Sequence, residues 1–266
     1  MSKLESDIHE KYKKSYRNII CIPFAFKEKT NTGVNIQGNA YTVYLKNACV
    51  ALCSAKHYNP EAEVVLATNI KINEIPKEIT KILKKFQVKI EEIPFDNFVF
   101  DKNYLWSLAF YKLCVLKYYS LSNYKNICYM DTDVFVQNNI GFIWEECDQN
   151  ILLYDINHGL QIQDYKILCE EYEKFTGEKK YITHYGGEFF AASLENTKIF
   201  VKSLEDVYQK MLKDNFITTK GDEFLVSVSA DKLQQYIKNT GGYIYIDSGH
   251  HQDLDLFLHV MNTILY

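Results

Sequence analysis

NICYMDTDVFV, residues 126–136, is the most informative stretch of the sequence. An apolar run typical of a buried strand leads into two carboxylates, Asp131 and Asp133, which stand one residue apart. In an open α/β sheet, ligands bind beyond the carboxyl ends of the strands, which is where these two residues would lie. Adjacent acids between apolar flanks repel one another unless a cation neutralises them. Because carboxylate oxygens suit Mn²⁺ or Mg²⁺, the pattern predicts a metal site; two solvated aspartates at a strand end are the alternative.

Strand and helix patterns alternate on both sides of this stretch. Apolar runs predict strands at Asn18–Phe26, Glu63–Thr68, Val88–Ile93, Asn126–Met130, Ile151–Tyr154, Glu188–Ala192 and Tyr243–Ile246. Apolar residues at helical spacing predict helices that begin near Tyr41, Pro76, Leu105, Tyr165, Phe200 and Leu254. This alternation predicts an α/β fold, with a Rossmann-like, mostly parallel sheet flanked by helices. No Pro- or Gly-rich linker divides the chain, so we expect a single domain after a charged N-terminal segment, residues 1–17.

Composition excludes several classes of protein. The chain has 266 residues, of which 47% are hydrophobic and 24% charged, so it is neither disordered nor collagen-like. No apolar run could span a membrane, and residues 1–17 lack the apolar core of a signal peptide, which predicts a cytoplasmic protein. An apolar stripe in residues 1–17 leaves a peripheral membrane contact open. The formal net charge of −4 does not favour binding to nucleic acid.

The cysteines and basic residues are informative in a different way. There are seven cysteines, an odd number with no Cys-x-x-Cys pair, and we expect them to be buried free thiols. Of the 30 basic residues only Arg17 is an arginine. An anionic ligand would therefore be held by lysine, a metal ion or backbone N–H groups.

The run from Leu105 to Val136 resembles the central segment of GT-A-fold glycosyltransferases, particularly those of family 8. In that family a helix that carries a basic residue leads into a strand ending in an Asp-x-Asp metal motif. The resemblance implies a GT-A-type fold and transfer of a hexose from a nucleotide-sugar, a UDP-hexose, to a carbohydrate or glycoconjugate acceptor. It implies Mn²⁺ or Mg²⁺ as the cofactor and retention of anomeric configuration. Residues 18–136 would form the nucleotide-binding half and residues 137–266 the sugar and acceptor half of one glycosyltransferase domain.

The resemblance also suggests roles for particular residues. It implies that Asp133 binds the metal, and that Asp131 contacts the metal or the ribose. Lys112 stands where the family commonly has Arg, and the apolar stripe of its helix points it inward. We expect Lys112 to contact the diphosphate or the sugar; snorkelling to solvent is the alternative. Gly186 and Gly187, before an expected strand, would let the backbone approach the donor sugar, although a bulge or turn explains them equally well.

Three acidic residues, Glu188, Asp222 and Glu223, are the candidate catalytic residues. Asp222 and Glu223 resemble the acidic segment that opens a late helix on the sugar side of family active sites. Their alternative role is to stabilise the start of that helix, where acidic side chains are common. Ala25, in the first expected strand, and Asn69, directly after the second, complete the predicted substrate-binding residues.

A histidine near the C-terminus is the remaining candidate metal ligand. His250 and His251 follow an expected strand at a point where this family often supplies such a ligand. Adjacent residues rarely face the same way, so only one should bind; we favour His251, and His259 is a weaker candidate.

Two other functions remain open. An aspartate-nucleophile phosphatase also uses Asp-x-Asp after a strand, but its motif wants Thr or Val where this chain has Phe135. A glycosyltransferase-like scaffold that binds a nucleotide-sugar without turnover is the non-enzymatic alternative.

Overall fold

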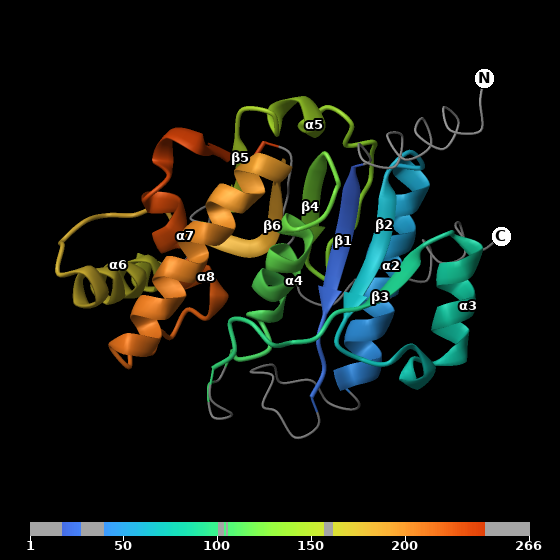
Figure 1. Cartoon of the computed structure of the whole chain (residues 1–266), viewed down its shortest axis with the longest axis horizontal. Coiled ribbons are helices and arrows are strands. Elements are labelled where there is room, and N and C mark those ends of the chain that lie inside the picture. The colour runs from blue at the N-terminus through green and yellow to red at the C-terminus, as the bar shows by residue number, and fades with distance from the viewer. Residues whose placement is uncertain (1–17, 28–39, 101–103, 105, 157–161, 243–266) are drawn as a thin grey trace, which may run out of the picture.

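The computed structural model describes residues 18–27, 40–100, 104, 106–156 and 162–242. These residues form a seven-stranded sheet of order β3-β2-β1-β4-β6-β5-β7, with helices on both faces (Figure 1). The strands are β1 Ile19–Phe24, β2 Glu63–Thr68, β3 Lys89–Glu92, β4 Asn126–Met130, β5 Ile151–Asp155, β6 Tyr185–Ser193 and β7 Ile237–Asn239. The α-helices are α2 Ala40–Tyr58, α3 Lys77–Lys85, α4 Tyr111–Ser120, α5 Ile143–Glu146, α6 Ile162–Thr176, α7 Leu194–Lys213 and α8 Asp222–Asp231.

The sheet is mostly parallel, and one strand runs against the others. β1 pairs in parallel with β2 and β4, and β2 pairs in parallel with β3. β6 lies between β4 and β5 and is antiparallel to both, whereas β7 is parallel to β5. The predicted α/β fold with a mostly parallel sheet is therefore confirmed.

The order of the strands reverses between β1 and β4. From β1 the chain builds outward through β2 to β3 at one edge, then returns to place β4 on the other side of β1. At such a reversal the connections leave the two strands in opposite directions, which opens a crevice beyond their carboxyl ends. The Asp131–Asp133 segment follows β4 directly and so lies at this crevice.

Both faces of the central strands are buried. Ile19 and Cys21 of β1 belong to the apolar core under α4, α7 and α8, whereas Ile20 and Ile22 pack in the core under α2 and α3. Because successive side chains point to opposite faces, a strand covered on both sides reads as one continuous apolar run. All seven cysteines are free, as predicted; six are buried and Cys169 is half-buried.

Two local predictions were wrong. The helix expected near Leu105 begins at Tyr111, because residues 106–110 form turns in which Ala109 N donates to Trp106 O. Lys112 therefore lies in the first turn of α4. Gly186 and Gly187 lie inside β6 rather than before it, where the pairing between β5 and β6 shifts register.

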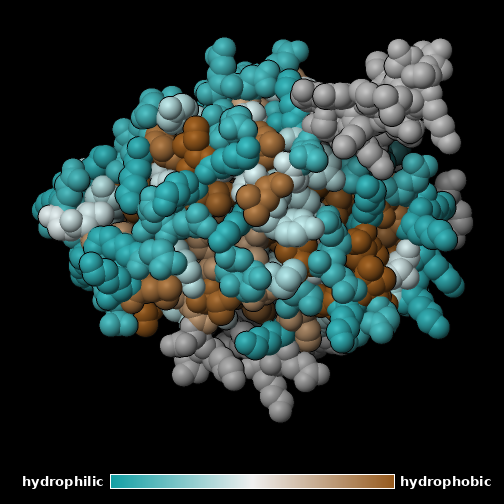
Figure 2. All heavy atoms as spheres, viewed as in Figure 1, coloured by the Kyte–Doolittle hydropathy of each residue, from teal (hydrophilic) through white to brown (hydrophobic). Residues whose placement is uncertain are grey.

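Some predictions lie outside the described residues: the charged segment 1–17, the strand at Tyr243–Ile246, the helix near Leu254, and the histidines at positions 250, 251 and 259. No helix within the described ranges is long and apolar enough to cross a membrane. The face drawn in Figure 2 carries mainly hydrophilic side chains, with apolar ones visible between them.

Candidate active site

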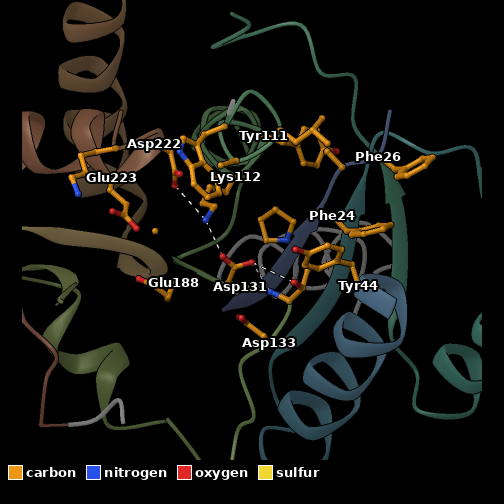
Figure 3. A pocket seen from close by; sticks show the side chains of 18 of the residues that line it. Phe24, Phe26, Tyr44, Tyr111, Lys112, Asp131, Asp133, Glu188, Asp222 and Glu223 are labelled. Atoms are coloured by element: carbon orange, nitrogen blue, oxygen red, sulfur yellow. Dashed lines mark hydrogen bonds and ion pairs between the residues drawn. The ribbon is translucent and has the colours of Figure 1, made fainter. Parts of the chain in front are cut away.

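A cavity of about 760 Å³ lies beyond the carboxyl ends of β1 and β4. Lys112 and Asp131 lie in its middle and separate two ends of different character (Figure 3). The aromatic end is formed by Phe24, Phe26, Tyr41 and Tyr44. The acidic end is formed by Asp164, Glu188, Asp222 and Glu223. Residues from both halves of the chain therefore line one cavity.

Lys112 forms ion pairs with two carboxylates from distant parts of the sequence. Its Nζ lies 2.9 Å from Asp131 Oδ2 and 3.3 Å from Asp222 Oδ2. The Lys112 side chain is only 13% exposed, so it does not snorkel to solvent. Burial alone would lower its pKa, but Asp131 and Asp222 outweigh burial and raise the pKa of Lys112 well above its usual value. Lys112 is therefore a fixed positive charge in the centre of the cavity.

Asp131 and Asp133 differ in how they are neutralised. Burial of Asp131 opposes ionisation, but Lys112 and a 2.7 Å hydrogen bond donated by Thr132 N outweigh it and hold the pKa of Asp131 below its usual value. Asp133 shows the opposite effect. Lost hydration and repulsion from Asp131 raise the pKa of Asp133. Of these two carboxylates, Asp133 is the one whose ionised form an added cation would stabilise more.

Two carboxyl groups of the acidic end ionise reluctantly. Burial raises the pKa of Glu188 to about 7; the nearby charge of Lys112 offsets part of this effect, and the charge of Glu223 adds a smaller increase. Burial raises the pKa of Asp222 to about 6 despite the ion pair with Lys112. Glu188 Oε2 and Asp222 Oδ2 are buried and accept no hydrogen bond from the described residues. Such atoms fit a ligand that supplies hydrogen-bond donors.

Gly187 and Gly186 leave the space that these polar side chains occupy. A Cβ on Gly187 would lie 2.3 Å from Asp222 Oδ2 and 2.7 Å from Lys112 Nζ. A Cβ on Gly186 would lie 1.8 Å from Glu188 Oε2. Gly187 also lines the cavity, whereas Gly186 lies beneath Glu188 and is not part of the lining. The two glycines therefore make room for charged side chains over β6, a role that the sequence did not indicate.

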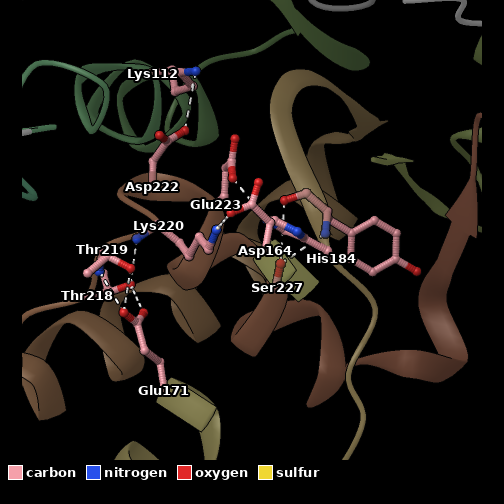
Figure 4. A network of polar contacts seen from close by, with 11 residues as sticks. Lys112, Asp164, Glu171, His184, Thr218, Thr219, Lys220, Asp222, Glu223 and Ser227 are labelled. Atoms are coloured by element: carbon pink, nitrogen blue, oxygen red, sulfur yellow. Dashed lines mark hydrogen bonds and ion pairs between the residues drawn. The ribbon is translucent and has the colours of Figure 1, made fainter. Parts of the chain in front are cut away.

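His184 contacts Glu223 but does not line the cavity (Figure 4). Its side chain is 2% exposed, and its Nε2 lies 2.9 Å from Glu223 Oε2. The next residue along, Tyr185, donates its backbone N–H to Ser227 Oγ at 2.9 Å, which ties the start of β6 to α8. The sequence did not single out His184, because a lone histidine before a strand carries no sign of its partner 39 residues later.

The loop before α8 is fixed by a buried carboxylate of α6. Glu171 Oε1 accepts hydrogen bonds from Thr219 N at 2.9 Å and Thr219 Oγ1 at 2.7 Å, and Glu171 Oε2 accepts one from Thr218 Oγ1. Lys220 Nζ, from the same loop, lies 2.9 Å from Asp164 Oδ1 (Figure 4). These contacts set where α8 begins and thus where Asp222 and Glu223 enter the cavity.

The aromatic end was not predicted from the sequence. The rings of Phe26 and Tyr41 lie 4.8 Å apart, and Phe24 and Tyr41 lie 6.0 Å apart. Lost hydration and the charges of Asp133 and Asp131 raise the pKa of Tyr44. With 37 Tyr and Phe residues in the chain, only the fold shows which of them gather here.

Ala25 and Asn69, both predicted to bind substrate, have different positions. Ala25 lines the cavity, as expected. Asn69 does not line it; its Oδ1 accepts a hydrogen bond from Phe26 N at 2.9 Å and its Nδ2 donates one to Phe26 O at 3.0 Å. Asn69 therefore holds the segment after β1 in place and acts on the cavity through Phe26.

Within the described ranges, no three His, Cys, Asp or Glu side chains gather closely enough to form a metal centre. If the protein binds a divalent ion, Asp131 and Asp133 are the two carboxylates beyond β4 that would hold it, and oxygen atoms of a diphosphate would complete its coordination. The pair fits such an ion because Asp133 has a raised pKa beside a second carboxylate.

No family model matches the chain, and no curated protein matches its sequence.

Proposed function

We propose that this chain is a metal-dependent glycosyltransferase of the GT-A type, similar to family 8, that transfers a hexose from a UDP-hexose to a carbohydrate or glycoconjugate acceptor. The observation that carries the proposal is a single cavity with an aromatic end, a central Asp-Lys-Asp cluster and an acidic end. A nucleotide-sugar presents a flat base, a diphosphate and a hydroxyl-rich ring in that same order.

The aromatic end suits the base and ribose. Phe26 and Tyr44 offer ring faces beside the carboxyl end of β1, and stacking on aromatic rings is a common way of holding a base. Ala25, between Phe24 and Phe26, is small enough for a ligand to approach the backbone. Asn69 keeps this segment in place through its two hydrogen bonds to Phe26.

The centre suits the diphosphate. Asp131 and Asp133 would hold a divalent ion such as Mn²⁺, which would stabilise the negative charge that develops on the departing diphosphate. Lys112 adds a fixed positive charge at the same place. Family 8 enzymes commonly have an arginine at the position that corresponds to Lys112. This chain has one arginine in all, and here a lysine would supply the positive charge.

The acidic end suits the sugar and the acceptor hydroxyl. Asp222 and Glu223 would accept hydrogen bonds from hydroxyl groups. Glu188, with a pKa of about 7, would exchange a proton near neutral pH, as a group that assists acid-base chemistry must. His184 positions Glu223 and Glu171 positions the start of α8.

The proposal is tested by measuring UDP release from UDP-glucose and UDP-galactose, with Mn²⁺ or with EDTA, with water or a panel of sugars as acceptors. We expect release that depends on Mn²⁺ and falls by about 100-fold or more in Asp133→Ala. Asp206→Ala, a surface change on α7, is the matched control and should retain full activity. Binding of UDP-sugars without release would indicate a scaffold, and phosphate release from a phosphomonoester would indicate a phosphatase; either result would contradict the proposal.

A further inference from the structure

The acidic end holds more carboxylates than the lysines beside it neutralise. Two lysines line the cavity, and both are already paired with carboxylates. Lys112 lies between Asp131 and Asp222, and Lys220 lies against Asp164. Glu188 and Glu223 form no ion pair with any lysine among the described residues. Above pH 7, where most Glu188 is ionised, an anionic group at this end would therefore meet negative charge that no lysine balances.

The same end offers acceptor atoms that await hydrogen-bond donors. Asp222 is 5% exposed, lines the cavity, and its Oδ2 accepts no hydrogen bond within the described part of the chain, although Lys112 Nζ is 3.3 Å away. Glu188 also lines the cavity; its Oε2 is buried over Gly186 and accepts no hydrogen bond from the described residues. Hydroxyl groups donate hydrogen bonds to carboxylates, whereas a ligand carboxylate only accepts them.

Glu223 cannot easily turn away from such a ligand. Its Oε2 lies 2.9 Å from Nε2 of His184, whose side chain is 2% exposed and does not line the cavity (Figure 4). A carboxylate fixed in this way keeps its charge facing the ligand and does not relax toward solvent.

We propose that the acidic end selects an uncharged hexose and excludes a hexuronic acid, so that the transferred sugar bears a hydroxyl and not a carboxylate at C6. This inference rests on the proposed function and narrows its substrate class. An uncharged ring supplies donors to Asp222, Glu188 and Glu223. A hexuronate replaces one donor with a negative charge that faces these carboxylates, and among the described residues the two lysines that line the cavity are already paired.

The test compares two pairs of donors that differ only at C6: UDP-glucose with UDP-glucuronate, and UDP-galactose with UDP-galacturonate. Dissociation constants are measured by calorimetry with Mn²⁺, alongside UDP alone. We expect the uronate to bind about tenfold or more weakly than its uncharged partner in at least one pair. If UDP alone binds and the two donors of each pair bind with equal affinity, this inference is wrong and the proposed function still stands. Failure of UDP itself to bind would overturn both.

Variants that remove one charge test whether the acidic end causes the difference in affinity between the uncharged and the uronate donors. Glu223→Gln removes one charge from the acidic end and should reduce the ratio of the two dissociation constants several-fold; Glu188→Gln is the second variant, should Glu223→Gln not fold. Glu170→Gln, on the surface of α6, removes the same charge elsewhere and should leave the ratio unchanged. An equal change in Glu170→Gln, or no change in either cavity variant, would show that the discrimination does not arise at the acidic end.

Discussion

Lys112 carries one positive charge between two carboxylates that lie 91 residues apart in the sequence, Asp131 at 2.9 Å and Asp222 at 3.3 Å. Its apolar helix face predicted that it points inward, and the structure confirms this. The pattern did not identify Asp222 as a partner, because helical spacing says nothing about which distant residue lies opposite. The ion pairs make Lys112 a structural residue as well as a candidate ligand for the diphosphate.

Lys112→Met should destabilise the protein by about 2–4 kcal/mol at pH 8, because Asp131 and Asp222 lose the cation that offsets their burial. The loss should be smaller at pH 5, where the unpaired carboxyl groups take up protons. Urea unfolding at both pH values measures this, with Lys166→Met as the control, since that lysine is largely exposed on α6. Equal stability of Lys112→Met and wild type at pH 8 would contradict the assigned ion pairs.

The raised pKa of Glu188 predicts the direction in which the stability of the protein changes with pH. This pKa rises from 4.5 to about 7 on folding, so between these pH values the folded state binds more protons than the unfolded state and stability falls as pH increases. Glu188→Gln removes this effect. In the metal-free protein, the free energy of unfolding of Glu188→Gln relative to wild type should increase by about 1–3 kcal/mol from pH 5 to pH 8.

The measurement is the urea midpoint of wild type and Glu188→Gln at several pH values. A stability difference that stays constant across this range would show that Glu188 titrates normally. Glu170→Gln serves as the control and should track wild type at every pH, because Glu170 is exposed.

At the scale of elements, the candidate site depends on where three elements begin or shift. α4 begins at Tyr111, which puts Lys112 in its first turn, and α8 begins at Asp222 directly after the loop that Glu171 holds. β6 shifts register against β5 near Gly187, beneath the ion pairs of Lys112. A change at any of these points should alter the cavity without touching the core.

Gly187→Ala tests the role of β6. The added Cβ would lie 2.3 Å from Asp222 Oδ2 and 2.7 Å from Lys112 Nζ, so both side chains must move. We expect a loss of about 1–3 kcal/mol in stability and weaker binding of UDP with Mn²⁺. Gly242→Ala is the matched control, since no atom of the described residues lies within 4 Å of its added Cβ. Unchanged stability and binding in Gly187→Ala would show that Lys112 and Asp222 do not pack over this residue.

Elements with strong local patterns were predicted well. β2 and β4 have the bounds expected from their apolar runs, and α7 covers the expected stripe. The reversed direction of β6 and the short strand β7 were not predicted, because an apolar run fixes neither the direction of a strand nor its neighbours. The turns before α4 share the apolar spacing of the helix and were read as part of it.

In the candidate site too, residues within one local pattern were predicted, and residues whose roles depend on distant contacts were not. Asp131, Asp133 and Lys112 were found because they lie in one patterned segment, and the structure brings them together with Glu188, Asp222, Glu223, Ala25 and Gly187. His184, Glu171 and the aromatic end were missed because their roles depend on contacts between distant segments. Asn69 was predicted to bind substrate but contacts Phe26 instead.

At the scale of the whole molecule, the reversal of strand order between β1 and β4 gathers the cavity from both halves of the chain. The aromatic end comes from residues 18–136 and the acidic end from residues 137–266. The division of these two parts into a nucleotide half and a sugar half stays a prediction. The Asp-Lys-Asp cluster lies where the two meet (Figure 3).

The most direct test of this account is the thermal stability of the protein with UDP, in Mn²⁺ and in EDTA. Saturating UDP with Mn²⁺ should raise the Tm by roughly 5 °C, as ligand binding to the folded state stabilises it, and UDP in EDTA should raise it little. Asp133→Ala should keep the wild-type Tm without ligand and lose most of the Mn²⁺-dependent shift. Stabilisation by UDP that is the same in EDTA, or the same in Asp133→Ala, or no stabilisation at all, would contradict a metal-dependent nucleotide-sugar site at Asp131 and Asp133.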